Sequence, residues 1–117
     1  DLLGQVSADM VGGRQLSGTG GSVDFMRGAA ASRGGISIVA LAATAKAGEI
    51  SRIVSEIAPG SATTAARTDI DRVVTEFGVA ELKGRSLDAR ANALIEIAAP
   101  SFRDALRDEW RARRSTF

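Results

Sequence analysis

Ile36-Ser37-Ile38-Val39-Ala40-Leu41-Ala42 is the stretch that decides the fold class. It is a continuous apolar run with several β-branched residues, and it lies between the glycine pair Gly34-Gly35 and Thr44. A short apolar run bounded in this way is typical of a strand buried inside a sheet. We therefore predict a buried strand over residues 36–42 and arrange the rest of the fold around it.

Shorter apolar segments predict further strands at residues 1–6, 49–57, 62–66 and 72–77. The first would be an edge strand, and the second would be half-exposed and stopped by Pro59-Gly60. Asp69 and Asp71 bracket a turn before the last strand, which we expect to end at Gly78.

Helices are predicted on both sides of these strands. The segment at about 22–31 follows a glycine cluster, ends in the small run Ala29-Ala30-Ala31 and stops at Gly34-Gly35, which favours a helix. After the strands, Ser86 can cap a helix that Pro100 ends, and its apolar residues recur at helical spacing. Strands in the middle of the chain with helices before and after them predict an α/β layer fold.

A last helix is predicted to open at Ser101, because Asp104 follows it at the spacing of a capping box. Its apolar stripe would consist of Phe102, Leu106 and Trp110. Glu109 and Arg113 stand four residues apart, so we expect them to form an ion pair on the exposed face.

The composition limits the possible functions. With 117 residues, the chain is long enough for one domain, and its 44% hydrophobic and 25% charged residues are typical of a globular protein. A net charge of +1 gives no overall field that would attract nucleic acid or an anionic membrane. The chain has no Cys and no His, which excludes thiolate nucleophiles, Ser-His-Asp catalysis and the commonest metal ligands. We expect no metal site, and no apolar run is long enough to span a membrane.

The glycine cluster Ser17-Gly18-Thr19-Gly20-Gly21-Ser22 is the most informative local feature. Glycines let the backbone approach a ligand closely, and the following helix would add the positive end of its dipole. Such a loop suits a phosphate or a developing oxyanion. Val23 stands where a dinucleotide-binding fingerprint requires glycine, and no P-loop lysine follows. The alternative interpretation is a flexible turn.

Two charged residues stand at places where an α/β sheet can bind ligands. Lys46 comes just after the predicted buried strand, at the edge where ligands of α/β sheets bind, although it could also be a solvated loop lysine. Glu76 lies late in an otherwise apolar strand, either as a site residue or as an exposed alternate residue. The Arg-rich end, residues 103–114, is offset by acidic residues and is interpreted as a solvated helix face rather than a nucleic-acid site.

Four stretches follow one another along the chain: Gly18–Phe25, Thr44–Val54, Asp71–Gly84 and Ala99–Asp104. In this order they resemble the C-terminal domain of the acetyl-CoA hydrolase/transferase family, which includes succinyl-CoA:acetate and 4-hydroxybutyrate CoA-transferases. They extend over nearly the whole chain. The resemblance implies an α/β fold of CoA-transferase type, with a sheet flanked by helices. It also implies that residues 1–117 form a C-terminal domain within a longer protein.

The chemistry implied by the resemblance starts with a glutamate that attacks an acyl-CoA thioester and then forms a glutamyl-CoA thioester. In the family this glutamate lies before the C-terminal domain, and no segment here resembles its surroundings. Gly21 resembles the loop glycine whose amide helps form the oxyanion hole, and Glu76 resembles the acidic residue of the family's Val-Thr-Glu-x-Gly motif. Gly18, Gly20, Ser22 and Lys46 are then expected on the CoA and acyl side.

The resemblance further implies partners and location. We expect acyl-CoA and a carboxylate acceptor as substrates, coenzyme A as a substrate rather than a tightly bound cofactor, a missing N-terminal domain of the same protein, a homo-oligomer and a cytoplasmic enzyme. This chain alone would be inactive. Ala47 departs from the glycine that many relatives carry, and Ser55 from a frequent proline. Hydrolase and transferase stay equally open, and the rival interpretation is a stand-alone, non-catalytic α/β module that binds a ligand or partner.

Overall fold

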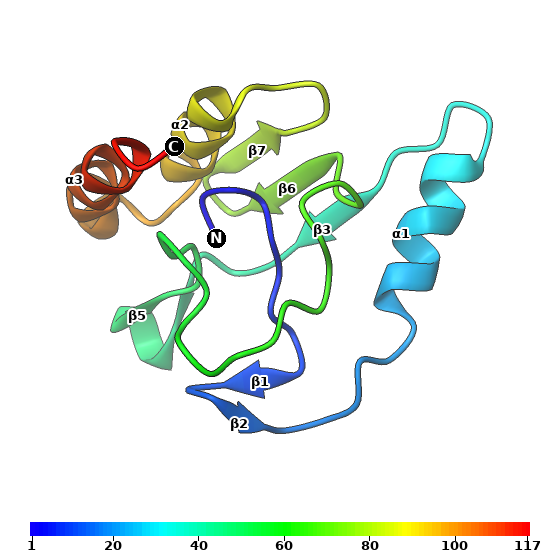
Figure 1. Ribbon diagram of the computed structural model, residues 1–117, viewed down its shortest axis with the longest axis horizontal. Helices are drawn as coiled ribbons and strands as arrows, with labels where there is room; N and C mark the ends of the chain where they lie inside the picture. The colour runs from blue at the N-terminus through cyan, green and yellow to red at the C-terminus, as the bar shows by residue number, and fades with distance from the viewer.

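A three-stranded sheet in the order β3-β6-β7 forms the centre of the protein, whose computed structural model describes all residues from 1 to 117 (Figure 1). The strands are β3 (Ile38–Ala40), β6 (Arg72–Thr75) and β7 (Gly78–Glu81). The pair β3–β6 is parallel and the pair β6–β7 is antiparallel. Helices flank this mixed sheet, so the predicted α/β class is confirmed.

The other elements are short hairpins, helices and single turns. They are β1 (Met10–Val11), β2 (Arg14–Gln15), α1 (Ser22–Ala31), β4 (Thr44–Ala45), η1 (Lys46–Gly48), β5 (Ile50–Ser51), α2 (Leu87–Glu96), η2 (Pro100–Phe102) and α3 (Arg103–Arg114). β1 pairs with β2, and β4 pairs with β5, each as a small antiparallel hairpin.

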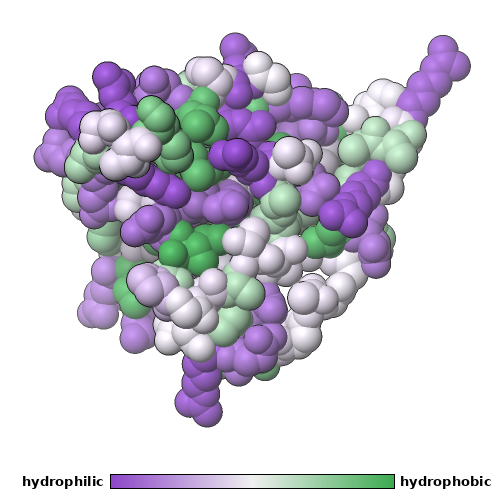
Figure 2. Space-filling view, in the orientation of Figure 1, coloured by the Kyte–Doolittle hydropathy of each residue, from purple (hydrophilic) through white to green (hydrophobic).

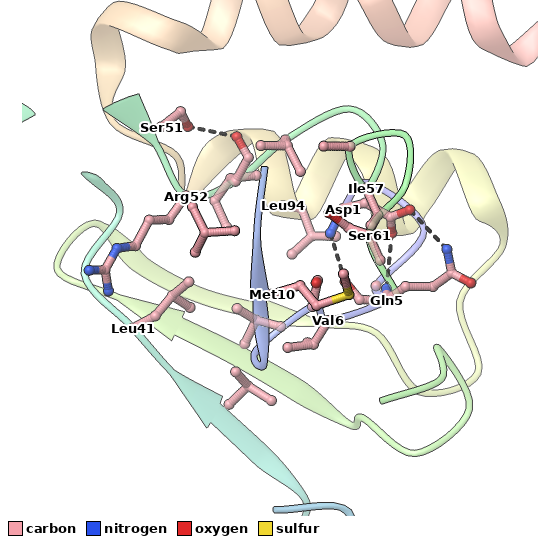
Figure 3. Close-up of a pocket in the computed structure, with 18 of the residues that line it drawn as sticks. Asp1, Gln5, Val6, Met10, Leu41, Ser51, Arg52, Ile57, Ser61 and Leu94 are labelled. Carbon is pink, nitrogen blue, oxygen red and sulfur yellow. Dashed lines mark hydrogen bonds between the residues drawn. The ribbon is translucent and has the colours of Figure 1, made fainter. Parts of the chain in front are cut away.

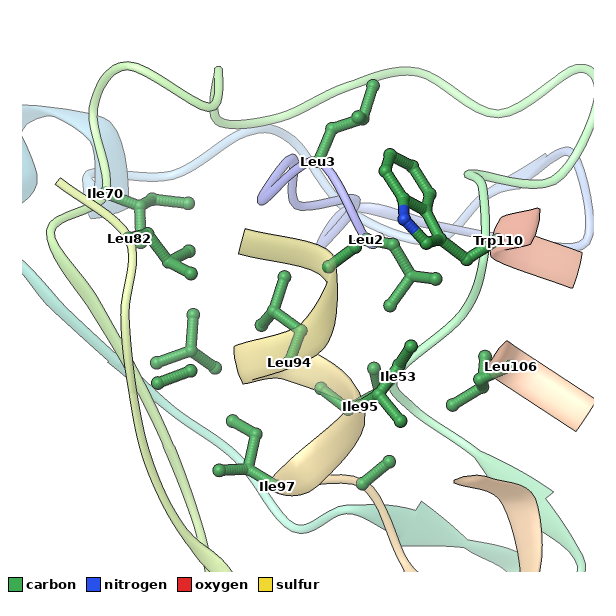
Figure 4. Close-up of a cluster of buried hydrophobic side chains, with 14 of the residues drawn as sticks. Leu2, Leu3, Ile53, Ile70, Leu82, Leu94, Ile95, Ile97, Leu106 and Trp110 are labelled. Atoms are coloured by element: carbon green, nitrogen blue, oxygen red, sulfur yellow. The ribbon is translucent and has the colours of Figure 1, made fainter. Parts of the chain in front are cut away.

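One face of the sheet carries the hydrophobic core. Val73 and Ala80, which are cross-strand partners, point to this face and are almost fully buried. α2 packs against β7, and α3 packs against α2 (Figure 1). Figure 4 shows the core that results, in which side chains from the N-terminal turn, from the segments next to the strands and from both C-terminal helices meet: Leu2, Leu3, Ile53, Ile70, Leu82, Leu94, Ile95, Ile97, Leu106 and Trp110.

The helices follow the sequence signals closely. α1 occupies the predicted residues 22–31, and Ser86 caps α2 by accepting a hydrogen bond from the amide of Ala89 at 3.3 Å. Leu106 and Trp110 of the predicted stripe are buried, and the Trp110 indole N–H donates to Asp88 Oδ1 at 2.9 Å.

Two details of the last helix were predicted wrongly. Pro100 starts a 3₁₀ turn that includes Ser101, so α3 begins at Arg103 and no side chain caps it. The capping box is therefore absent. Glu109 and Arg113 do not pair, because the Arg113 guanidinium bonds to the carbonyl oxygen of Ser55 and lies 3.9 Å from the Asp1 carboxylate.

Several strand predictions also need correction. Residues 1–4 form a turn closed by the Gly4 amide on the Asp1 carbonyl at 2.9 Å, which inserts Leu2 and Leu3 into the core. Within the predicted strands 49–57 and 62–66, pairing is limited to β5 and to a single bridge between Val6 and Ala65. In these segments the apolar residues turn toward the core or a cavity without forming a continuous ladder.

Two further strand predictions need correction, one at Gly78 and one at Ile38. Gly78 does not end the sheet but begins β7, because its φ of +143° lets the chain reverse after Glu76 and Phe77. β3 was predicted to be buried, yet Ile38 is 53% exposed. β3 stands at the edge of the sheet, with β6 as its one neighbour.

Candidate functional site

The glycine cluster forms an exposed loop that leads into α1. Gly20 has a φ of +63°, which favours glycine, whereas Gly21 is the N-cap residue with an ordinary φ of −101°. The carbonyl of Gly21 accepts the first helical hydrogen bond from the amide of Phe25 at 3.1 Å. No side chain caps α1, so the amides of its first turn point outward without a side-chain partner.

Gly21 also has room around it. A methyl group at this position would come no closer than 3.7 Å to another atom, the Cε2 atom of Phe25. Its backbone conformation is open to any residue, and the space around it within this chain accommodates the side chain of alanine. A requirement for glycine at position 21 would therefore come from something outside these 117 residues, such as a substrate.

Glu76 lies in the turn between β6 and β7 rather than late in a strand. Its carboxylate Oε2 atom accepts a hydrogen bond from the backbone N–H of Ala43 at 2.8 Å. Ala43 is fully buried, and its carbonyl accepts the amide of Arg52 at 2.8 Å. Glu76 thus ties the β6–β7 turn to the base of the β4–β5 hairpin.

Lys46 stands at the tip of that hairpin. Lys46, Ala47 and Gly48 have successive φ values of +48°, +54° and +95°. The left-handed region is unfavourable for lysine and alanine, so the surrounding strands must hold this turn in place. The Lys46 side chain is exposed and makes no ion pair within the chain.

The structure brings only part of the predicted site together. Glu76 and the hairpin that carries Lys46 meet through Ala43, where β3 and β6 end. The loop with Gly18, Gly20, Gly21 and Ser22 lies at the base of α1, at the lower right of Figure 1, whereas β5 of the hairpin lies at the lower left. No hydrogen bond or ion pair joins the two groups within the chain.

Sequence reasoning missed the structural role of Asp71, which it placed in a turn. The Asp71 carboxylate is buried and accepts the amide of Ser37 at 3.0 Å, while Lys83 Nζ lies 3.2 Å from its other oxygen. The hydrogen bond from Ser37, followed by the contact with Lys83, holds the pKa of Asp71 below its usual value. Asp71 therefore aligns β3 with β6, and the chain leaves these two strands toward the hairpin that carries Lys46 and the turn that carries Glu76.

A cavity of about 400 Å³ lies elsewhere, between the N-terminal turn, β3 and the segment after β5. Figure 3 shows Val6 and Met10, Leu41 after β3 and Leu94 of α2 on its walls. The buried hydroxyl of Ser7, which also lines it, finds no hydrogen-bond partner. None of the six predicted site residues lines this cavity, so we do not assign it to the site.

The chain holds no cluster of three or more acidic residues placed to bind a metal ion. None of its helices combines the length and the apolar character that crossing a membrane requires.

Comparison with known proteins shows what the chain is similar to. The sequence profile of the family described as "Acetyl-CoA hydrolase/transferase C-terminal domain" matches residues 1–110. The 4-hydroxybutyrate coenzyme A transferase of Clostridium kluyveri is 50% identical over 113 residues, which are 97% of this chain and 26% of that protein. The succinyl-CoA:cyclohexane-1-carboxylate CoA transferase of Geobacter metallireducens is 52% identical over 106 residues, 91% of this chain and 24% of that protein.

The chain is also similar to a solved structure over nearly its whole length. The crystal structure of RipA from Yersinia pestis superposes with a TM-score of 0.88 at 42% identity, covering 97% of this chain and 25% of that one. The chain thus spans about a quarter of the length of the proteins it matches. With the profile matching nearly every residue, the chain belongs to the acetyl-CoA hydrolase/transferase family, to whose C-terminal domain it corresponds.

Proposed function

We propose that this chain is the C-terminal part of a longer enzyme that, through a glutamyl-CoA thioester, either moves coenzyme A from an acyl-CoA to a second carboxylate or hydrolyses the acyl-CoA and releases free CoA. The single observation that carries the proposal is the family match over residues 1–110. Several family members that the chain resembles are named CoA-transferases, which favours transfer over hydrolysis.

The reaction needs a carboxylate nucleophile and an oxyanion site, and it needs neither Cys nor His. The glutamate carboxylate attacks the thioester carbonyl, the C–S bond breaks, and an acyl-glutamyl anhydride and CoA thiolate form. The thiolate then attacks the glutamyl carbonyl, which releases the first carboxylic acid as its anion and leaves glutamyl-CoA. The acceptor carboxylate repeats these steps in reverse, whereas water would release free CoA.

The residues of this chain would act on the charge that develops at the carbonyl oxygen. The amide of Gly21 would donate to that oxygen, supported by Gly18, Gly20 and Ser22 in the same loop. The outward-facing amides at the start of α1 support this assignment, because they have no side-chain cap. Lys46 would contact CoA from the β4–β5 turn, where its ammonium group is exposed.

Glu76 would hold the opposite wall of the site. Its hydrogen bond to Ala43 supports a positioning role, because it links the β6–β7 turn to the hairpin that carries Lys46. The nucleophilic glutamate would come from the part of the polypeptide that precedes residue 1. We place the whole enzyme in the cytoplasm as a homo-oligomer, with no resident cofactor.

The covalent intermediate provides the test. The full-length protein is incubated with acyl-CoA without acceptor, digested, and analysed by mass spectrometry. We expect a CoA thioester on one glutamate outside residues 1–117, and its loss when a carboxylate acceptor is added. The absence of both the adduct and any CoA transfer would refute the proposal in favour of a non-catalytic module.

Variants of Glu76 separate its charge from its hydrogen bond. Gln at position 76 still offers an oxygen to the Ala43 amide at 2.8 Å, whereas Ala does not. If the carboxylate charge acts at the site, Glu76→Gln lowers kcat with little change in CoA affinity. If the hydrogen bond alone matters, Glu76→Gln keeps wild-type kcat and Glu76→Ala loses it.

A further inference from the structure

The apolar composition of residues 36–42 is that of a buried strand, whereas β3 stands at the edge of the sheet. Residues 36–42 are apolar except for Ser37, a pattern typical of a strand that is covered on both faces. In this chain β3 pairs with β6 alone, and Ile36 and Ile38 are 42% and 53% exposed. A run of this composition at an open edge would promote association with any other strand.

The backbone of β3 leaves hydrogen-bonding groups open along that edge. The carbonyl of Ser37 accepts the amide of Arg72 at 3.0 Å, and the amide of Leu41 donates to Val74 at 3.0 Å. Both bonds point toward β6, so the alternate residues Ile38 and Ala40 direct their N–H and C=O groups away from it. Neither residue has a backbone partner on the outer side.

The other edge of the sheet is protected in a way that β3 is not. On β7, Glu81 carries a charge at the edge and pairs with Arg72 at 3.1 Å. Natural edge strands use such charges, or prolines, to prevent further pairing. Residues 36–42 contain neither a charge nor a proline. The open edge of β3 therefore has the character of an interior strand.

The uncovered face of the sheet points to the same conclusion. Ala40, Val74 and Val79 form one cross-strand row on the face opposite the core, and Val79 is 56% exposed. Parallel strand pairs such as β3–β6 are normally covered on both faces. Figure 2 shows one side of the molecule, on which apolar side chains reach the surface in patches between polar ones.

We propose that β3 is an interior strand of a larger sheet and that its open edge receives an extended segment of the same polypeptide from the part that precedes residue 1. The occupant follows from length: the matched relatives are about four times as long as this chain, and the matched family domain is the C-terminal one. The same preceding part then covers the row of Ala40, Val74 and Val79. This inference rests on the proposal that the chain is part of a longer protein and not on the reaction.

Hydrogen exchange of the full-length protein tests the pairing. If a strand covers the edge, the amides of Ile38 and Ala40 exchange at least about 100-fold more slowly than an exposed loop amide such as that of Gly34. Exchange of both amides at the rate of Gly34 would overturn the proposal. Protection that appears only at high protein concentration would also overturn it, because the occupant would then be a second copy.

Two lysine substitutions add a matched comparison in the full-length protein. Ile38→Lys places a charge on β3, and Val11→Lys places one on β1, at a residue that is 66% exposed. We expect Ile38→Lys to abolish the protection of Ala40 or to lower the melting temperature, and Val11→Lys to do neither. Equal effects of the two substitutions would contradict the proposal. CoA-transfer activity is scored separately, so an inactive protein with protected amides would refute the reaction and leave the pairing intact.

Discussion

Replacing Asp71 by alanine removes the carboxylate that aligns β3 with β6. The side chain is 9% exposed, and one of its oxygens accepts the amide of the buried Ser37 at 3.0 Å. A hydrogen bond to a charged group contributes about 1.5–3 kcal/mol, and its loss leaves the Ser37 amide buried without a partner. We therefore expect Asp71→Ala to lower the free energy of unfolding by about 3 kcal/mol.

Two further variants separate the hydrogen bond from the charge. Asp71→Asn keeps an oxygen for the Ser37 amide and loses only the added strength of an ionised acceptor, about 1–2 kcal/mol. Lys83→Met removes the ion pair at 3.2 Å, but the Lys83 side chain is 68% exposed, so the expected loss is at most about 1 kcal/mol. Urea unfolding of the 117-residue chain, followed by the fluorescence of Trp110, measures all three.

The pH dependence of the free energy of unfolding is a second, independent measure of the stabilisation by the Asp71 carboxylate. The pKa of Asp71 is lower in the folded chain than its ordinary value of 3.8, so the unfolded chain binds the proton more readily. The stabilisation is complete above the ordinary pKa and is lost as the pH falls through the lower, folded value. The difference between wild type and Asp71→Asn should shrink below about pH 4. A difference that stays constant across this range, or an Asp71→Ala variant as stable as Lys83→Met, would refute the reasoning.

Three other substitutions test local features of the fold. Ser86→Ala removes the cap of α2 and should lower the free energy of unfolding by about 1 kcal/mol, measured by urea unfolding. Gly35→Ala would bring a methyl group to 1.9 Å from the carbonyl oxygen of Ala29, so the end of α1 must move; we expect a loss of about 1–3 kcal/mol, and an unchanged stability would contradict the position of this glycine. Ala47→Gly relieves a φ of +54° and should raise the melting temperature, whereas a lower one would argue against the left-handed turn.

Features with a local cause could be predicted from the sequence. The bounds of α1 follow from the glycine groups on either side of it, and the cap at Ser86 follows from a polar residue directly before an apolar helical pattern. The burial of Leu106 and Trp110 follows from their spacing along one helix face.

Features that depend on distant parts of the chain could not be predicted. Gly78 was expected to end a strand, yet its positive φ begins the return strand β7, and a glycine in sequence does not distinguish the two. Asp71 looked like a turn residue because its partner, the amide of Ser37, lies 34 positions away. The predicted burial of β3 was wrong because β3 lies at the edge of the sheet with β6 as its one neighbour, and an apolar sequence pattern does not reveal where a strand stands in its sheet.

In the candidate site, too, local features could be predicted and the arrangement in space could not. The residue types at positions 21, 46 and 76 indicated possible roles in binding or catalysis, but how these residues lie relative to one another depends on the sheet. The hydrogen bond between Glu76 and Ala43, which connects Glu76 to the hairpin that carries Lys46, has no sequence pattern that would predict it. The separation of the glycine loop from Glu76 and Lys46 also depends on the fold and could not be predicted.

The role of the glycine loop in acyl transfer is the central claim, and the kcat of the full-length enzyme tests it most directly. Gly21→Ala is compared with Gly28→Ala, the same change inside α1, where a methyl group meets no other atom within 4 Å. Gly21 has an ordinary φ and open space, so both variants should fold and bind CoA. We predict that Gly21→Ala lowers kcat by about 10²–10³-fold, because the added methyl group would hold the acyl carbonyl oxygen away from the Gly21 amide and so cost one oxyanion donor, and that Gly28→Ala keeps wild-type kcat. Wild-type kcat in Gly21→Ala would contradict the account.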